Sequence, residues 1–391
     1  MNVAALAERA QALLAADEPE QAEALLVPHL ASGSGPIPLW RALAQALRRQ
    51  GRMQEVQQIQ IMLVDMFPGD LTTRFDLAET LLTLGAFDRG WREYRHRYSL
   101  AHTTKIERKV QRPRWEGEAI PGRTLLIHDE QGFGDTFQFI RLVHWAKERS
   151  QASVIIEVNP ESYGLIRRSF PGFEIVRQGE LPPIFDTHCE LMSLPMALGL
   201  QLAQLPGRMP YLMADPPRLE HWRARLQLLA RPLVALAWAG RPNHPNDANR
   251  SITLDTLAPL AASGAQFVAV QKGPAAAQAA PMGLKLFPLS DEIESFEDTA
   301  AILCIADLLI SVDSSPVHLA GALGRPAWVM LPFVAEWRWL QSVDTTPWYP
   351  QHRLFRQPRR GDWASVVAGM TEALRALGIQ TSPADSTSPQ K

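Results

Sequence analysis

The stretch that most constrains the fold is an apolar run that ends in a glycine turn and then enters a helix. Residues 124–127 are apolar enough for a buried strand, and Gly132 and Gly134 punctuate the turn that follows. From Asp135 onward, apolar residues recur at helical spacing. A strand, a glycine turn and a helix in this order are typical of an open parallel α/β sheet, whose ligands bind beyond the carboxyl ends of the strands. We therefore expect Asp135 at that edge, either capping the helix or taking part in chemistry.

Strand and helix patterns alternate through the chain in two series. The first predicts strands at 123–128, 153–158, 173–177 and 185–191, and helices at 135–149, 160–169 and 194–201. The second, from Pro216 onward, predicts strands at 233–238, 266–271, 284–288, 307–312 and 326–331, and helices at 217–229, 253–262, 296–305, 315–323, 334–341 and 362–377. Two such layers in one chain imply two α/β lobes with a ligand cleft between them.

The first hundred residues repeat with a fixed period. Gly51 and Gly85 lie 34 residues apart, and one more step of 34 residues back from Gly51 reaches Asp17. Small and apolar residues recur in the same register, at Ala10, Ala44 and Ala78 and at Leu13, Leu47 and Leu81. This period resembles the tetratricopeptide (TPR) family of helix–turn–helix repeats, which present a concave face to partner proteins. An unrelated helical bundle with coincident spacings is the alternative.

The composition predicts several domains and argues against some classes of function. A chain of 391 residues is long enough for two or three domains. A net charge of −2 without a basic block gives no support to nucleic-acid binding. No run approaches the ~18 apolar residues of a membrane span, and the first turns lack a signal-peptide core. We therefore expect a soluble, cytoplasmic protein without a membrane span.

The cysteine and histidine positions do not predict a metal site. Cys189 and Cys304 are far apart, match no redox or metal spacing, and suit a reducing compartment. His128, His144 and His318 have no cysteine or acid partners at ligand spacing. The chain contains no nucleophile elbow and no Walker motif, and its glycine turn lacks the third glycine of the dinucleotide fingerprint.

The clearest ligand motif lies in the second series, where the strand at 307–312 runs into Asp313, Ser314 and Ser315. Pro316 suits the first turn of the helix that follows. The amino terminus of a helix offers free N–H groups and a positive dipole end to a phosphate. Asp313 would repel a diphosphate, so it is expected to cap the helix or to accept hydrogen bonds from sugar hydroxyls. A capped helix without a ligand is the alternative.

Three cations follow strands in the same series. Arg241 and Arg250 flank a polar loop that begins at Gly240, and Lys272 follows the strand at 266–271. Together they suit an anionic nucleotide, although any one of them alone would be an ordinary surface charge. An aromatic segment at 333–340 is expected to pack between the lobes or, less simply, to form a sugar-binding wall.

These motifs come in the order found in one known family. Residues 131–136, 237–240, 271–273 and 313–324 resemble the glycosyltransferase domain of the heptosyltransferase-like class, glycosyltransferase family 9, as found in bacterial TPR proteins. The resemblance implies a GT-B fold, in which TPR repeats precede two Rossmann-like lobes. The expected parts are TPR repeats at 1–100, a connector at 101–121, an acceptor-side lobe at 122–215, a nucleotide-sugar-side lobe at 216–378 and a disordered tail at 379–391.

The resemblance also implies roles for particular residues. Asp135 matches the proposed general base of an inverting glycosyltransferase, and the donor-binding segment matches Asp313, Ser314, Ser315 and His318. The remaining candidates are Gly240, Arg241 and Lys272 for the donor, and Gln131, Gly132 and Gly134 for the acceptor side. The nucleotide-sugar would be a co-substrate, with neither a metal nor a further cofactor required.

The repeats bear on the acceptor. They favour a protein or cell-surface glycan acceptor docked on the TPR face, and hence a role in protein glycosylation. Two alternatives stay open: a non-catalytic TPR scaffold with a degenerate GT-B domain, and a sugar-nucleotide epimerase on the same fold.

Overall fold

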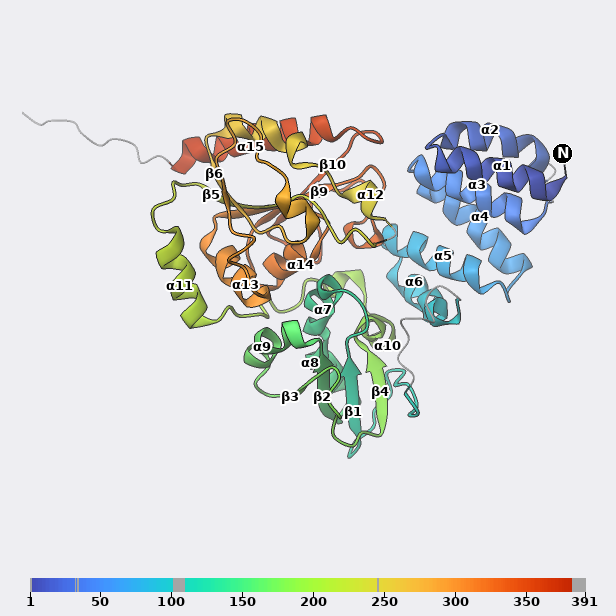
Figure 1. Ribbon diagram of the computed structural model, residues 1–391. Helices are drawn as coiled ribbons and strands as arrows, with labels where there is room; N and C mark the ends of the chain where they lie inside the picture. The colour runs from blue at the N-terminus through green and yellow to red at the C-terminus, as the bar shows by residue number, and fades with distance from the viewer. Residues whose placement is uncertain (1, 32, 34, 101–109, 245, 382–391) are drawn as a thin grey trace, which may run out of the picture.

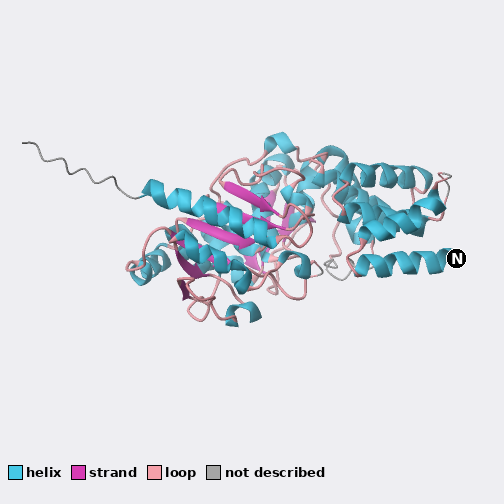
Figure 2. Cartoon of the chain, turned by 90° about the horizontal axis from the view of Figure 1, so that it is seen from above, coloured by secondary structure: helices cyan, strands magenta, loops and turns pink. Residues whose placement is uncertain are grey.

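The computed structural model describes residues 2–31, 33, 35–100, 110–244 and 246–381, which form a helical region followed by two α/β lobes (Figure 1). Viewed from above, the strands lie between helices and the helical region extends to one side (Figure 2). No described helix is both long enough and apolar enough to cross a bilayer.

The helical region contains six α-helices and a 3₁₀ turn among its described residues. They are α1 (Val3–Ala15), α2 (Pro19–Leu30), α3 (Ile37–Arg49), α4 (Met53–Met66), α5 (Leu71–Thr83), α6 (Phe87–Tyr94) and η1 (Arg95–Ser99). Each α-helix packs on the next. Asp17, Gly51 and Gly85 lie in the turns after α1, α3 and α5, and have positive φ angles of 58°, 74° and 77°. The 34-residue period therefore corresponds to a repeated backbone turn, while membership of the TPR family remains a prediction.

Part of the expected connector is ordered against the first lobe. Residues 101–109 lie outside the described residues. Trp115 is fully buried, and its backbone N–H donates to the carbonyl of His188 at 2.7 Å. Arg114 forms an isolated parallel bridge with His188. The end of the connector thus extends the sheet at the β4 edge.

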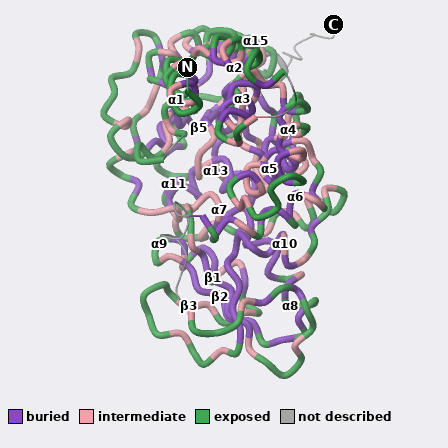
Figure 3. Tube along the Cα trace, turned by 90° about the vertical axis from the view of Figure 1, so that its right-hand side faces the viewer, coloured by how far each residue is buried: buried purple, intermediate pink, exposed green. Residues whose placement is uncertain are grey.

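The first lobe is built on a four-stranded parallel sheet in the order β3-β2-β1-β4. Its strands are β1 (Thr124–His128), β2 (Ser153–Val158), β3 (Glu174–Arg177) and β4 (Thr187–Glu190). Its helices are α7 (Phe133–Phe139), η2 (Ile140–Leu142), α8 (Val143–Ser150), α9 (Pro160–Ser169), η3 (Leu191–Ser193), α10 (Leu194–Leu198) and η4 (Leu202–Gln204). The single helix predicted at 135–149 is therefore divided by a 3₁₀ turn. Buried positions run along β1 and β2 (Figure 3).

The second lobe is built on a six-stranded parallel sheet in the order β10-β9-β8-β5-β6-β7. Its strands are β5 (Leu233–Ala237), β6 (Gln266–Ala269), β7 (Leu286–Pro288), β8 (Leu308–Val312), β9 (Ala327–Leu331) and β10 (His352–Arg356). Its helices are α11 (Pro216–Leu226), α12 (Asp247–Arg250), η5 (Leu254–Ser263), η6 (Pro274–Ala277), α13 (Phe296–Ile305), α14 (Ser315–Ala322), η7 (Trp337–Trp339) and α15 (Trp363–Thr381).

The structure differs from the sequence predictions at three places in or beside this lobe. The segment 334–341 is not a helix apart from η7, because Glu336 is extended (ψ 152°) and Leu340 has a φ of 52°. The edge strand β10 was not predicted. The tail predicted at 379–391 overlaps the end of α15, which continues to Thr381; residues 382–391 lie outside the described residues.

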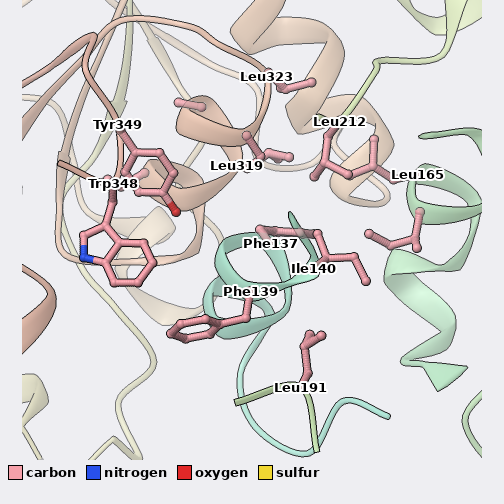
Figure 4. Packing of buried hydrophobic residues seen from close by; sticks show 14 of the residues in the cluster. Phe137, Phe139, Ile140, Leu165, Leu191, Leu212, Leu319, Leu323, Trp348 and Tyr349 are labelled. Atoms are coloured by element: carbon pink, nitrogen blue, oxygen red, sulfur yellow. The ribbon is translucent and has the colours of Figure 1, made fainter. Parts of the chain in front are cut away.

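One continuous core joins all three parts of the molecule. Phe137, Phe139 and Ile140, at the end of α7, pack with apolar residues of both lobes (Figure 4). The same cluster includes Trp91 of the helical region and Trp348 of the second lobe. Burial of this size dominates the stability of such an interface. The core therefore holds α7, and with it Asp135, at the junction of the three parts.

Candidate functional site

Asp135 lies in the first turn of α7 and is held from two sides. Its Oδ2 accepts a hydrogen bond from the backbone N–H of Gly132 at 3.0 Å. Its Oδ1 accepts one from Nη2 of Arg338, in the second lobe, at 2.6 Å. The Asp135 side chain remains 24% exposed. The carboxylate thus caps the helix, which is one of the two roles expected for Asp135. It is also accessible at the junction between the lobes.

Gly134 brings the two lobes into contact. A Cβ at this position would lie 2.8 Å from Cδ2 of His318 and 3.5 Å from Cα of Ser315, both on α14. The glycine therefore allows α7 of the first lobe to pack directly against the amino-terminal turn of α14. Gly134 is one of the acceptor-side candidates, and that role remains a prediction; the structure shows its packing role between the lobes. Gln131 is exposed beside it.

The expected donor segment begins α14 as predicted. Ser314 is the extended N-cap residue, and its hydroxyl pairs with Ser311 Oγ at 3.0 Å rather than with a backbone N–H of the helix. His318 is buried, its Nδ1 lies 3.0 Å from the Tyr349 hydroxyl, and its ring stacks on Trp339. The helix therefore starts without a side-chain cap.

Asp313 is a half-buried carboxylate next to this helix. Its Oδ1 lies 3.8 Å from Nε2 of His318. Although burial raises the pKa of Asp313, the hydrogen bond and charge of His318 and the charge of Arg250 lower it below its usual value. Asp313 is therefore ionised at neutral pH and can accept hydrogen bonds from hydroxyl groups.

Of the three predicted cations, the structure brings Arg250 to this segment. Its Nη1 donates to the carbonyl of Asp313 at 2.8 Å. A Cβ on Gly240 would lie 2.6 Å from Nη2 of Arg250, so the guanidinium packs directly against this glycine. Arg241 is exposed at the end of the strand. Lys272 instead donates to the carbonyls of Ser290 and Ile293, at 2.6 and 2.8 Å, and so ties loops together.

Gln271 organises the loop that carries Gly240. The side chain is buried, and its Oε1 accepts the N–H groups of Trp238 and Ala239, each at 2.9 Å. Its amide donates to the carbonyls of Ala239 and Lys272. A buried amide with this many backbone partners fixes a loop conformation.

Sequence reasoning missed two charged residues of the aromatic segment. Arg338 is 10% exposed at its side chain and bonds both Asp135 and Glu336. Burial raises the pKa of Glu336 to about 8, although the charge of Arg338 opposes the shift. The sequence signal that could have identified them is an acidic and a basic residue, Glu336 and Arg338, among tryptophans. An unpaired charge in such a buried segment would be costly.

Carboxylates from both lobes influence the same side chain, His244. Burial and the charge of Arg250 lower the pKa of His244, while the negative charges of Asp313, Asp247 and Asp135 raise it in part. His244 thus lies within electrostatic range of Asp135 in one lobe and Asp313 in the other. The carboxylate of Asp135 therefore faces the amino terminus of α14 and Arg250 in the other lobe.

A possible metal-binding geometry exists where none was predicted. His128, His188 and Glu190 are buried on the adjacent strands β1 and β4, and one ligand atom from each lies within 4.8 Å of the others. Although burial raises the pKa of Glu190, hydrogen bonds from Arg114 prevail and lower it to about 2. Since Arg114 already compensates this carboxylate, a buried polar network accounts for the cluster. The expected absence of a metal remains a prediction.

Comparisons with known proteins give distant similarities. No family model matches the chain. Protein FlbA of Caulobacter vibrioides is 28% identical over 334 residues, covering 79% of this chain and 56% of FlbA. The chain thus spans little more than half the length of this relative.

Several similar solved structures are described as glycosyltransferases. A glycosyl transferase family 9 protein from Veillonella parvula is 10% identical, covers 68% of this chain and all of its own, and has a TM-score of 0.44. The ADP-heptose LPS heptosyltransferase II of E. coli is 15% identical, with 66% and 99% covered and a TM-score of 0.47. The iron-containing heptosyltransferase TibC, in complex with ADP-D-β-D-heptose, is 14% identical, with 68% and 78% covered and a TM-score of 0.46. All three structures have TM-scores below 0.5 and are at most 15% identical to this chain.

Proposed function

We propose that this chain is an inverting, metal-independent glycosyltransferase that moves a sugar from a nucleotide-diphosphate sugar to a hydroxyl group. The observation that carries the proposal is the placement of Asp135 in one lobe opposite the α14 amino terminus and Arg250 in the other. Two parallel sheets meeting at these strand ends are a common arrangement for nucleotide binding. The order of the family-like motifs supports the same function.

The proposed reaction needs opposite charges on its two sides. The acceptor hydroxyl gives its proton to Asp135 while its oxygen forms a bond to the anomeric carbon of the sugar. The bond from that carbon to the phosphate oxygen breaks, and the electron pair stays on the leaving nucleoside diphosphate. The N–H groups that begin α14 and the guanidinium of Arg250 stabilise this negative charge.

On the donor side, we propose that Asp313 and His318 contact sugar hydroxyls, whereas Ser314, Ser315 and the loop at Gly240 lie nearer the phosphates. Arg241 is exposed at the rim and free to approach a nucleotide. For Lys272, also a donor-side candidate, we propose a structural role instead. Its ammonium donates to two backbone carbonyls and so connects two loops.

We further propose that the helical region, as a TPR array, docks a protein or cell-surface glycan acceptor. A cavity of about 170 Å³ lies between α3, α4 and α5, and its polar lining includes Arg41, Arg48, Asp76 and Glu79. Helix α5, which lines part of this cavity, also packs on η7, the short 3₁₀ turn that contains Arg338. Charges of both signs suit a polar acceptor segment.

The direct test uses the purified protein with a panel of nucleotide-sugars, beginning with ADP-heptose, the donor named for TibC. Thermal unfolding shows which nucleotide binds, and product analysis shows transfer. We expect Asp135→Asn to keep donor binding and to lower transfer by at least ~10²-fold, the usual contribution of a general base. Near-normal turnover by this variant would rule out Asp135 as the base.

A scaffold function is the second candidate. Both oxygens of Asp135 already have partners, which is also what a purely structural carboxylate would show. Absence of stabilisation by every nucleoside diphosphate tested would favour this scaffold and reject the enzyme.

A further inference from the structure

We infer that Arg338 is a positioning residue that orients Asp135 and connects it to the helical region. The inference rests on the proposed function, since it concerns the same carboxylate. It goes beyond the family resemblance, which supplies no role for the segment around Arg338.

Arg338 holds two residues of the first lobe with one guanidinium group. Its Nη2 donates to Asp135 Oδ1 at 2.6 Å, and its Nε donates to Gln138 Oε1 at 2.7 Å. Asp135 and Gln138 are three positions apart and so lie on the same face of α7. The planar fork of arginine suits two acceptors at fixed spacing, whereas lysine would hold only one point.

This contact fixes the plane of the Asp135 carboxylate. Gly132 N–H binds one oxygen and Arg338 binds the other. Each carboxylate oxygen has a second lone pair, so an acceptor hydroxyl can still donate its proton there.

The other side of Arg338 is held by its own lobe and by the helical region. Its Nη1 bonds Glu336 Oε1, and its backbone N–H donates to Glu336 Oε2 at 2.9 Å. Its guanidinium lies over the ring of Trp337, 4.4 Å from the centroid. Trp337 makes edge-to-face contacts with Trp91 and Tyr94 of α6, at 5.4 and 6.3 Å between centroids.

All three parts of the molecule therefore meet at one side chain. The second lobe supplies Arg338, the first lobe supplies the carboxylate, and α6 supplies the rings that pack against Trp337. Displacing the helical region would move Trp337 and, with it, the arginine that orients Asp135. The consequence is that Arg338 acts on the transfer step rather than on donor binding.

The test compares Arg338→Met and Arg338→Lys with Arg225→Met as the matched control. Arg225 forms an exposed pair with Glu292 at 2.8 Å on the second lobe. We expect Arg338→Met to lower kcat by at least ~10²-fold, as poor positioning of a catalytic group does, with the donor KM within about threefold. The lysine variant should regain part of kcat, and the control should behave like the parent protein.

A second measurement does not depend on activity. Hydrogen exchange followed by mass spectrometry reports the Gly132 amide, which donates to Asp135. We expect a peptide over residues 129–137 to exchange at least about tenfold faster in Arg338→Met than in Arg225→Met, because local protection follows local structure. Unchanged exchange would overturn the positioning role, as would an unchanged kcat in an active enzyme. If the parent protein transfers no sugar but exchange still responds, the proposed function fails while the structural link holds.

Discussion

Gly134→Ala provides a sharp test of how the lobes meet. Gly134 lies inside α7 with an ordinary helical backbone, so alanine adds no strain in φ and raises helix propensity by up to about 1 kcal/mol. The new methyl group, however, would lie 2.8 Å from Cδ2 of His318. That ring cannot move away easily, since it bonds Tyr349 and stacks on Trp339. Overpacking of this kind costs about 1–3 kcal/mol.

The matched control is Gly369→Ala in α15, where a Cβ meets no atom within 4 Å. The control keeps the gain in helix propensity without the clash. We therefore expect the free energies of unfolding of the two variants to differ by about 1–3 kcal/mol, with Gly134→Ala the less stable. Thermal unfolding of the two proteins in parallel measures the difference, which should amount to a few degrees in Tm. Equal stabilisation by both alanines would refute the direct contact between α7 and α14.

The remaining predictions concern charges. Arg250→Met should weaken nucleoside-diphosphate binding by about tenfold or more, as loss of a charged hydrogen bond does, whereas Lys272→Met should leave that affinity unchanged; calorimetry measures both. Glu190→Gln should destabilise the protein at pH 7 by up to about 3 kcal/mol, because the folded pKa of about 2 lies below the unfolded value. This stabilisation is present above pH ~4.5 and is lost as the pH falls towards 2, so urea unfolding of parent and variant should converge in acid. Glu79→Lys, in the helical cavity, should lower kcat/KM for the acceptor by severalfold without changing donor affinity, while Glu372→Lys on the exposed face of α15 should change neither.

Local patterns were sufficient for much of the two lobes. The helix predicted at 296–305 has the observed bounds, because Ser295 and Asp298 form a capping box at its start. Strand β2 was also predicted with its observed bounds, since a short run of β-branched residues is a strong local signal. The helix predicted at 334–341 was wrong because the structure of this segment depends on distant contacts. Its tryptophans are buried in the core shared by all three parts, and that burial does not require a helix.

The candidate site shows the same division. Asp135, Asp313 and Arg250 each follow a strand, and the carboxyl ends of parallel strands meet at one edge, so their placement could be anticipated from order alone. Arg338 could not be, because its partner Asp135 is 203 residues away and in the other lobe. Lys272 carried the expected charge but bonds carbonyls of a neighbouring loop, a contact that no local spacing reveals.

The sequence by itself determined the local geometry of this protein: the strands, most of the helices, the glycine turns and the turn that recurs every 34 residues. Each depends on residues within a few positions of one another, through apolar period, capping and positive φ. Only the tertiary structure decided what faces Asp135, because that depends on how two lobes and a helical region pack around α7. The sequence predicts the glycine turn as a place where a ligand approaches; the tertiary structure shows that Gly134 also lets α14 approach and that Arg338 bonds Asp135 beside it.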